Sequence, residues 1–99
     1  MSSLKTYELR FHKNAFKEWE RLDATVRTHF SRKLAERMRE PHVESAHLSN
    51  MRGCYKIKLV ASGYRLIYHV IDRELVVLVL SISKREADAA YRKAHLRLT

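Results

Sequence analysis

The sequence has few of the residues that break or cross-link a chain. Its 99 residues include two glycines, one proline and one cysteine, Cys54. A single cysteine excludes an internal disulfide, and with it the class of small secreted proteins that cysteine pairs hold together. Because chain breakers are so rare, Pro41, Gly53 and Gly63 are informative markers of where helices and strands end.

Long apolar runs are also missing. No stretch approaches the roughly 20 apolar residues of a membrane-spanning helix. The first ten residues, "MSSLKTYELR", lack the apolar block of a signal peptide. We therefore expect one domain over residues 1–99, in the cytoplasm and without a membrane partner.

Acidic residues are too few to balance the basic ones. Lys and Arg number 20 against 11 Asp and Glu, which gives a formal net charge of +9. Such an excess attracts polyanions, among which nucleic acid, an acidic protein and an anionic membrane all fit. The chain has no glycine-rich phosphate loop and no histidine or cysteine spacing typical of a zinc site, so we expect neither a cofactor nor a metal.

The apolar pattern predicts seven elements in the order β-α-α-β-β-β-α. Helix 2 has Asp23 as its N-cap and ends before Pro41, and its apolar residues recur every four positions. The run 75–82 is the most apolar of the predicted strands, so it should be central, with the first strand on its far side. The predicted segments are strands 6–11, 54–60, 64–71 and 75–82 and helices 13–22, 24–40 and 84–98.

These elements predict a small α+β domain. Its four-stranded sheet should be twisted and mostly antiparallel, because consecutive strands usually pair as hairpins. The two N-terminal helices should form an antiparallel hairpin over one face of the sheet, and the C-terminal helix completes the fold.

The hairpin 54–71 combines apolar strands with three cations. Side chains alternate along a strand, so Lys56 and Lys58 share one face. A two- or four-residue turn places Arg65 on that same face, and a four-residue turn makes Lys58 and Arg65 direct cross-strand partners. Like charges in this position are destabilising. We therefore expect this face to be open and to bind an anion; the alternative is a solvated face whose long side chains splay into water.

The segment "SKRE" presents a second conflict. Ser83 and Glu86 have the spacing of a capping box for the last helix. Lys84 and Arg85 would then oppose the helix dipole in its first turn, although a helix N-terminus binds phosphate well. The alternative is that the strand continues further and Arg85 is an ordinary surface charge.

Three stretches, "CYKIKL", "SGYRLIYHVID" and "VVLVLSISKRE", together with the later Tyr91, resemble the RelE toxins of bacterial toxin–antitoxin modules. The resemblance extends from about Phe11 to the C-terminus. It implies an endoribonuclease that cuts mRNA in the ribosomal A site and inhibits translation. It also implies a cognate antitoxin, the ribosome and mRNA as partners.

Metal-independent RNA cleavage uses the 2′-OH as nucleophile, so it needs a base, a stabiliser of the charged phosphorane and an acid for the 5′-oxygen. The resemblance assigns Lys58 as base, Lys56 as its electrostatic neighbour and Arg65 to the phosphorane. Positive neighbours and desolvation favour the neutral form of a lysine, which gives Lys58 a physical route to this role. The resemblance makes Arg85 the leaving-group acid, or a stabiliser of its charge, and makes Tyr91 the residue that orients or stacks the substrate. RNA binding is expected from Lys56, Lys58, Arg65, Lys84 and Arg85.

Several alternatives stay open. His69 has the strand parity of Arg65 and is a chemically more ordinary base. An inert toxin similar to ParE, which binds DNA gyrase, has no need of these cations around one phosphate, and a third possibility is an RNA-binding module without turnover. We expect the antitoxin segment to be acidic and amphipathic. It could displace the last helix or simply cover the hairpin.

Overall fold

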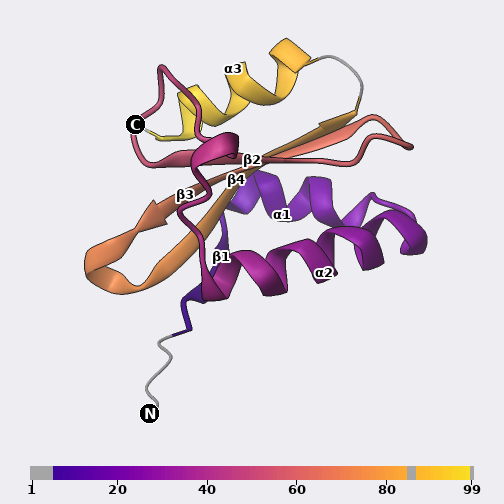
Figure 1. The fold of residues 1–99 in the computed structure, drawn as a ribbon. Helices are drawn as coiled ribbons and strands as arrows, with labels where there is room; N and C mark the ends of the chain where they lie inside the picture. Colours follow the sequence, from indigo (N-terminus) through magenta and orange to yellow (C-terminus); the bar gives the residue numbers. More distant parts are fainter. Residues whose placement is uncertain (1–5, 85–86, 99) are drawn as a thin grey trace.

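The computed structural model describes residues 6–84 and 87–98 of the chain. The elements follow the predicted order, with a short 3-10 turn after α2 and another after β3 (Figure 1). Their bounds are β1 (Glu8–Phe11), α1 (Lys13–Glu20), α2 (Ala24–Arg39), η1 (Glu44–Ala46), β2 (Cys54–Lys58), β3 (Tyr64–Ile71), η2 (Asp72–Glu74), β4 (Val76–Lys84) and α3 (Ala87–Leu98).

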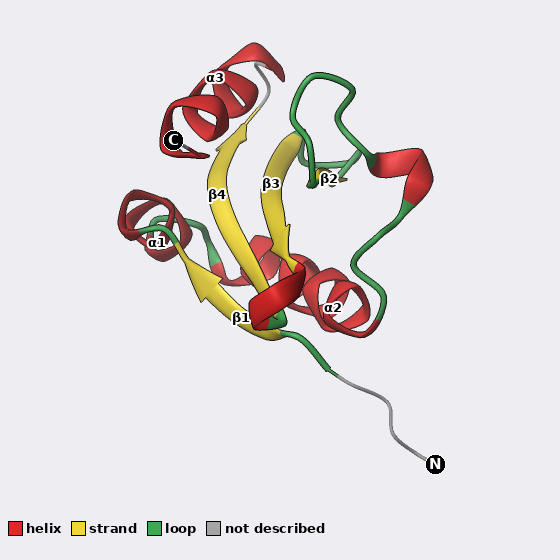
Figure 2. Ribbon diagram, turned by 90° about the vertical axis from the view of Figure 1, so that its left-hand side faces the viewer, coloured by secondary structure: helices red, strands yellow, loops and turns green. Residues whose placement is uncertain are grey.

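The four strands form one sheet in the order β1-β4-β3-β2. The pairs β2–β3 and β3–β4 are antiparallel, and β1 runs parallel to β4. The most apolar strand therefore lies inside the sheet with the first strand on its far side, as the sequence predicts. Figure 2 shows the twist of this sheet between α3 and the other two helices.

The helices α1 and α2 form the predicted antiparallel hairpin below the sheet in Figure 1. The Asp23 carboxylate accepts a hydrogen bond from the Val26 amide at 3.0 Å and so caps α2. From α2, Phe30 and Leu34 are almost fully buried. They belong to the main apolar cluster of the sheet face below, whose buried members also include Val26, Tyr55, Ile57, Leu66, Tyr68, Val77 and Val79.

The opposite face of the sheet holds a second, smaller cluster. The α3 residues Ala90 and Ala94 are fully buried there, against Cys54, Ile67 and Leu80. This face also carries Lys56, Lys58 and Arg65, so the expectation of an open face is correct only for the part near the hairpin turn. The rest is covered by α3, because its stripe of small alanines allows the helix to approach the sheet closely.

Two element boundaries differ from the prediction. The strand β4 continues to Lys84, and α3 begins at Ala87 instead of Lys84. The reason is the length of β3, whose first residues Tyr64 and Arg65 pair with Lys84 and Ser83. Lys84 is therefore the end of a strand and lies outside the first turn of a helix. Arg85 and Glu86, the other half of the "SKRE" prediction, lie outside the described residues.

Candidate active site

The turn between β2 and β3 fixes the register of the cationic face. The Leu59 amide donates a hydrogen bond to the Tyr64 carbonyl oxygen at 2.9 Å, and the Gly63 amide donates to the Leu59 carbonyl oxygen at 2.8 Å. Four residues, 60–63, therefore form the turn, in which Gly63 has a positive φ of 81° that favours glycine. This is the predicted case in which Lys58 and Arg65 are direct cross-strand partners.

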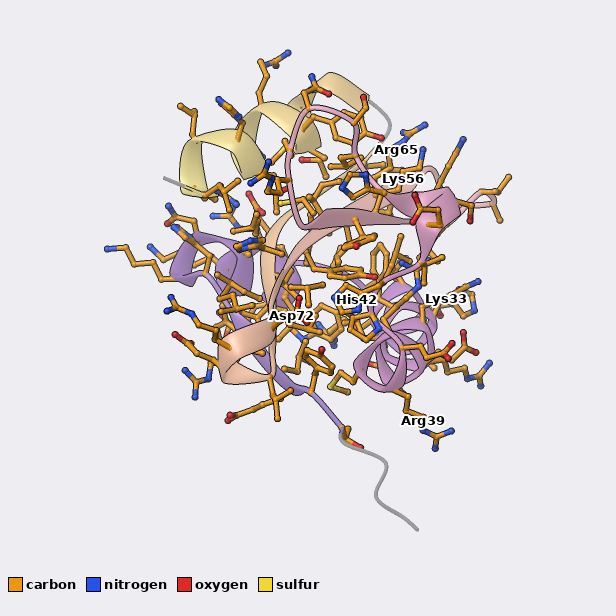
Figure 3. The ribbon with its side chains drawn as sticks, turned by 60° about the vertical axis from the view of Figure 1, so that its left-hand side comes forward. Lys33, Arg39, His42, Lys56, Arg65 and Asp72 are labelled. Carbon is orange, nitrogen blue, oxygen red and sulfur yellow. The ribbon has the colours of Figure 1, made fainter. Side chains whose placement is uncertain are left out.

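Lys56, Lys58 and Arg65 form one cationic group, which we call the hairpin cations. Lys58 is exposed, whereas Lys56 and Arg65 are half-buried. Lys56 lies diagonally from Arg65, two pairs along the ladder, and Figure 3 shows both side chains at the same end of the sheet. Cβ atoms of directly opposite residues are about 5 Å apart, so one phosphate group can contact more than one of these side chains.

Arg37, from α2, fixes the edge strand that carries two of the three cations. Its Nη1 donates to the Lys56 carbonyl oxygen at 3.1 Å and to the Tyr68 hydroxyl at 2.8 Å. The Tyr68 hydroxyl in turn donates to the Pro41 carbonyl oxygen at 2.7 Å. Sequence reasoning missed Arg37, because it is 19 residues from Lys56 and looks like any polar position beside the apolar stripe of its helix.

Tyr91 reaches the same region from α3. A groove of about 380 Å³ is lined by Lys56, Tyr91 and residues 47–51 of the loop before β2. The half-buried Tyr91 packs against the cluster that contains Met51 and Cys54. The fold thus brings a predicted cation and the predicted stacking residue to one groove, although they are 35 positions apart in the sequence.

The Lys58 side chain borders a different hollow from the one that Lys56 lines. It lines a second hollow of about 430 Å³ at the outer edge of β2, with α2 residues that include His29, Arg32 and Lys33. Lys56 and Tyr91 therefore share one groove, while Lys58 borders a neighbouring one. An RNA strand that crosses the edge of β2 would meet both.

Lys84 lies away from the hairpin cations. It is opposite Tyr64 in the ladder, and its Nζ is 5.5 Å from the centre of the Tyr64 ring. Tyr64 packs against the main apolar cluster, so Lys84 faces the side of α1 and α2. Arg65 faces the other side. Arg85 lies outside the described residues, and its predicted role stays a prediction.

His69 shares the face of Arg65 but lies farther along it. It pairs with Cys54, four residues beyond Arg65, which is about 13 Å at the rise of a strand. Burial lowers the pKa of His69, and the nearby charge of Asp72 offsets only part of this effect. Its neighbour Cys54 is fully buried, and this burial raises the pKa of the thiol to about 11. Neither side chain lines the groove of Lys56 and Tyr91.

A second polar cluster lies at the opposite end of β3. The Tyr7 hydroxyl donates to the Asp72 carboxylate at 2.6 Å, and His42 Nε2 lies 3.0 Å from the same carboxylate. The hydrogen bond from Tyr7 is the main cause that lowers the pKa of Asp72. Figure 3 shows His42 and Asp72 well below Lys56 and Arg65, so this cluster ties Tyr7 to η2 and is separate from the hairpin cations.

The described residues also show whether the chain has a metal site or a membrane-spanning helix. No three His, Cys, Asp or Glu side chains among residues 6–84 and 87–98 gather closely enough to hold a metal ion. Within the same described residues, no helix has both the length and the hydropathy that crossing a membrane requires.

The sequence and the fold match known proteins. Residues 9–89 match the family described as the ParE toxin of the type II toxin–antitoxin system parDE. The Escherichia coli protein named mRNA interferase toxin RelE is 47% identical over 92 residues, which cover 93% of this chain and 97% of that protein. The chain therefore belongs to this superfamily of type II toxins, and within it to the RelE toxins.

Solved structures support the same placement. A mutant of the E. coli toxin RelE in the free state aligns with a TM-score of 0.88 at 46% identity, over 95% of this chain and 99% of that one. A chain of the intact E. coli RelBE toxin–antitoxin complex aligns with a TM-score of 0.79 at 49% identity, over 81% of this chain and 98% of that one. These alignments confirm the predicted fold and the predicted family.

Proposed function

We propose that this chain is the toxin of a toxin–antitoxin module and acts as a metal-independent endoribonuclease that cleaves mRNA in the ribosomal A site. The observation that carries the proposal is the direct pairing of Lys58 with Arg65 beside the groove of Lys56 and Tyr91. The two positive charges face each other across the sheet, so one phosphate of a bound RNA can contact both side chains. The relative named an mRNA interferase supports the reaction type.

The cleavage step follows from the chemistry of RNA. The 2′-oxygen attacks the adjacent phosphorus, its proton passes to the side-chain amine of Lys58, and the bond from phosphorus to the 5′-oxygen breaks. Arg65 binds the phosphorane oxygens with its planar fork, and Lys56 adds positive charge. Tyr91 stacks on or orients a base. Arg85 stabilises or protonates the leaving 5′-oxygen, and the products are a 2′,3′-cyclic phosphate and a 5′-hydroxyl.

The ribosome and an antitoxin are the proposed partners. The grooves beside Lys56 and Lys58 are shallow, so the protein alone has little surface with which to hold a flexible RNA in the in-line geometry that attack requires. The ribosome presents the mRNA already ordered, in the cytoplasm. The net charge of +9 suits the ribosome and also an acidic antitoxin segment.

The test uses purified ribosomes that carry a defined mRNA with a vacant A site. We expect cleavage within the A-site codon, with a 2′,3′-cyclic phosphate on the upstream fragment, and much slower cleavage of the same mRNA without ribosomes. An intact mRNA would overturn the proposal. Inhibition of DNA supercoiling by gyrase in a parallel reaction would then favour the ParE-like alternative.

A further inference from the structure

The helix α3 has little apolar area with which to hold its place. Its two fully buried side chains among those described, Ala90 and Ala94, are each a single methyl group. The hydrophobic stabilisation of a helix scales with the apolar area that it buries, so this pair contributes much less than the phenylalanine and leucine of α2. Polar contacts must contribute a larger share, and one of them is the hydrogen bond from the Ser81 hydroxyl to the Ala90 carbonyl oxygen, at 2.7 Å.

The strongest polar contacts lie at the outer edge of β4. Within the described residues, β1 pairs with β4 only over residues 76–79. Beyond that point two backbone groups of β4 bind side chains instead of a strand. The Ile82 amide donates to Glu18 Oε1 at 3.0 Å, and the Leu80 carbonyl oxygen accepts from Arg97 Nη1 at 2.8 Å. A residue of α1 and a residue of α3 thus complete the edge together.

Glu18 and Arg97 also bind each other. Arg97 Nη1 donates to Glu18 Oε1 and Nη2 donates to Oε2, both at 3.0 Å, and Lys93 Nζ donates to Oε2 at 3.2 Å. The side chains of Glu18 and Arg97 are only 16% and 14% exposed. Burial acts to raise the pKa of Glu18, but the hydrogen bonds from Arg97, the Ile82 amide and Lys93 outweigh it and hold the pKa below its usual value. The carboxylate therefore stays ionised at neutral pH.

We propose that Glu18 is a positioning residue: through Arg97 and Lys93 it anchors α3 to α1 and to the edge of β4, and so holds Tyr91 at the groove beside Lys56. On α3, Lys93 lies two residues after Tyr91, and Arg97 lies about 1.7 turns after Tyr91. Without the carboxylate, two half-buried cations would face each other, and α3 would shift or loosen. The consequence for cleavage rests on the function proposed above.

The test begins with Glu18→Gln, which keeps the shape of the side chain and removes its charge. Glu20→Gln is the matched control, because Glu20 is exposed on the same helix. We expect amide hydrogen exchange over 87–98 to become at least about tenfold faster in Glu18→Gln and to stay unchanged in Glu20→Gln. Arg97→Lys, which keeps one donor and loses the fork, should give an intermediate increase.

A double-mutant cycle then connects the anchor to Tyr91. Glu18→Gln should lower the single-turnover cleavage rate about 10- to 100-fold, as misplaced catalytic groups do, with little change in the affinity for ribosomes. In a Tyr91→Ala background the same substitution should change the rate less than about twofold, because Tyr91 is the group that Glu18 positions. Equal effects in both backgrounds, or unchanged exchange in α3, would overturn the proposal.

The two readouts separate this proposal from the proposed function. Hydrogen exchange needs no RNA. Faster exchange in Glu18→Gln together with a wild-type protein that cleaves nothing overturns the endoribonuclease and supports the anchoring of α3. Normal cleavage by both proteins supports the endoribonuclease and overturns the positioning role of Glu18.

Discussion

The two faces of the sheet are built on different principles. The face below α1 and α2 is filled by large apolar side chains such as Phe30, Leu34 and Tyr68, each at most 1% exposed. The face below α3 is covered over part of its area by the alanines of α3 and by the half-buried Tyr91 and Leu98, and it carries the hairpin cations on the rest. The face below α1 and α2 stabilises the fold by burying apolar area. The face below α3 depends more on polar contacts and exposes like charges.

This difference separates stability from activity in one small domain. Apolar area buried by α2 stabilises the fold and is closed to solvent. The hairpin cations place like charges on one face of the sheet, which is the pattern expected where a local rule is broken for function. Substitutions on the first face should therefore change the free energy of unfolding, and substitutions on the second should change mainly the rate of cleavage.

The largest expected change in stability comes from Phe30→Ala. Truncating a fully buried phenylalanine removes its apolar contacts and leaves a cavity, at a cost of about 3–5 kcal/mol. The control is Phe16→Ala, because Phe16 is 45% exposed, and it should cost no more than about 1 kcal/mol. Urea denaturation measures both. Similar costs at the two positions would contradict the assignment of the stabilising face.

Arg37→Met tests a side chain whose hydrogen bonds connect α2 to the edge strand. It removes the donor to the Lys56 carbonyl oxygen and one of the two hydrogen bonds of the Tyr68 hydroxyl, at a cost of about 1–3 kcal/mol. Cleavage should also slow, since Lys56 and Lys58 lie on that strand. Arg39→Met, on the exposed side of the same helix, is the control. An unchanged free energy of unfolding in Arg37→Met would contradict the role of Arg37 in fixing the edge strand.

Lys58→Met should stabilise the fold, whereas the two substitutions above should destabilise it. It keeps the apolar stem and removes one of two like charges that face each other, so the free energy of unfolding should rise by roughly 0.2–1 kcal/mol while cleavage is lost. The matched control is Lys33→Met, at the same hollow, which should keep most of the cleavage rate. A less stable Lys58→Met protein would show that the cations do not repel each other as proposed.

The smallest expected effect concerns His69. Its pKa lies below the ordinary 6.5 because of burial, so it is neutral in the folded protein at neutral pH. As pH falls below about 6.5 the unfolded chain takes up this proton first, and the free energy of unfolding should decrease. His69→Gln should weaken that decrease and leave the dependence of the cleavage rate on pH unchanged. A rate profile that loses its pH dependence in His69→Gln would make His69 the base.

Much of the fold is readable from the sequence because local patterns specify it. The four-residue spacing of Val26, Phe30, Leu34 and Met38 predicts α2, and Gly63 predicts the turn that pairs Lys58 with Arg65. Contacts between distant segments leave no such pattern.

Glu18 contacts Arg97 across 79 positions, and nothing near it in the sequence distinguishes it from the exposed Glu20. The cover of α3 over the cationic face was missed for a related reason, since Ala90 and Ala94 are small enough to suit either a surface or a close helix–sheet contact.

The most direct measurement is the single-turnover cleavage rate of Arg65→Ala on ribosomes with a defined mRNA, together with its free energy of unfolding. We predict a rate at least about 100-fold lower, because a preorganised donor to the transition state is lost. The free energy of unfolding should stay within about 1 kcal/mol of the wild-type value, and Arg65→Lys should recover only part of the rate. Arg73→Ala, exposed at the other end of β3, should match the wild type. Undiminished cleavage by a folded Arg65→Ala protein would contradict the account.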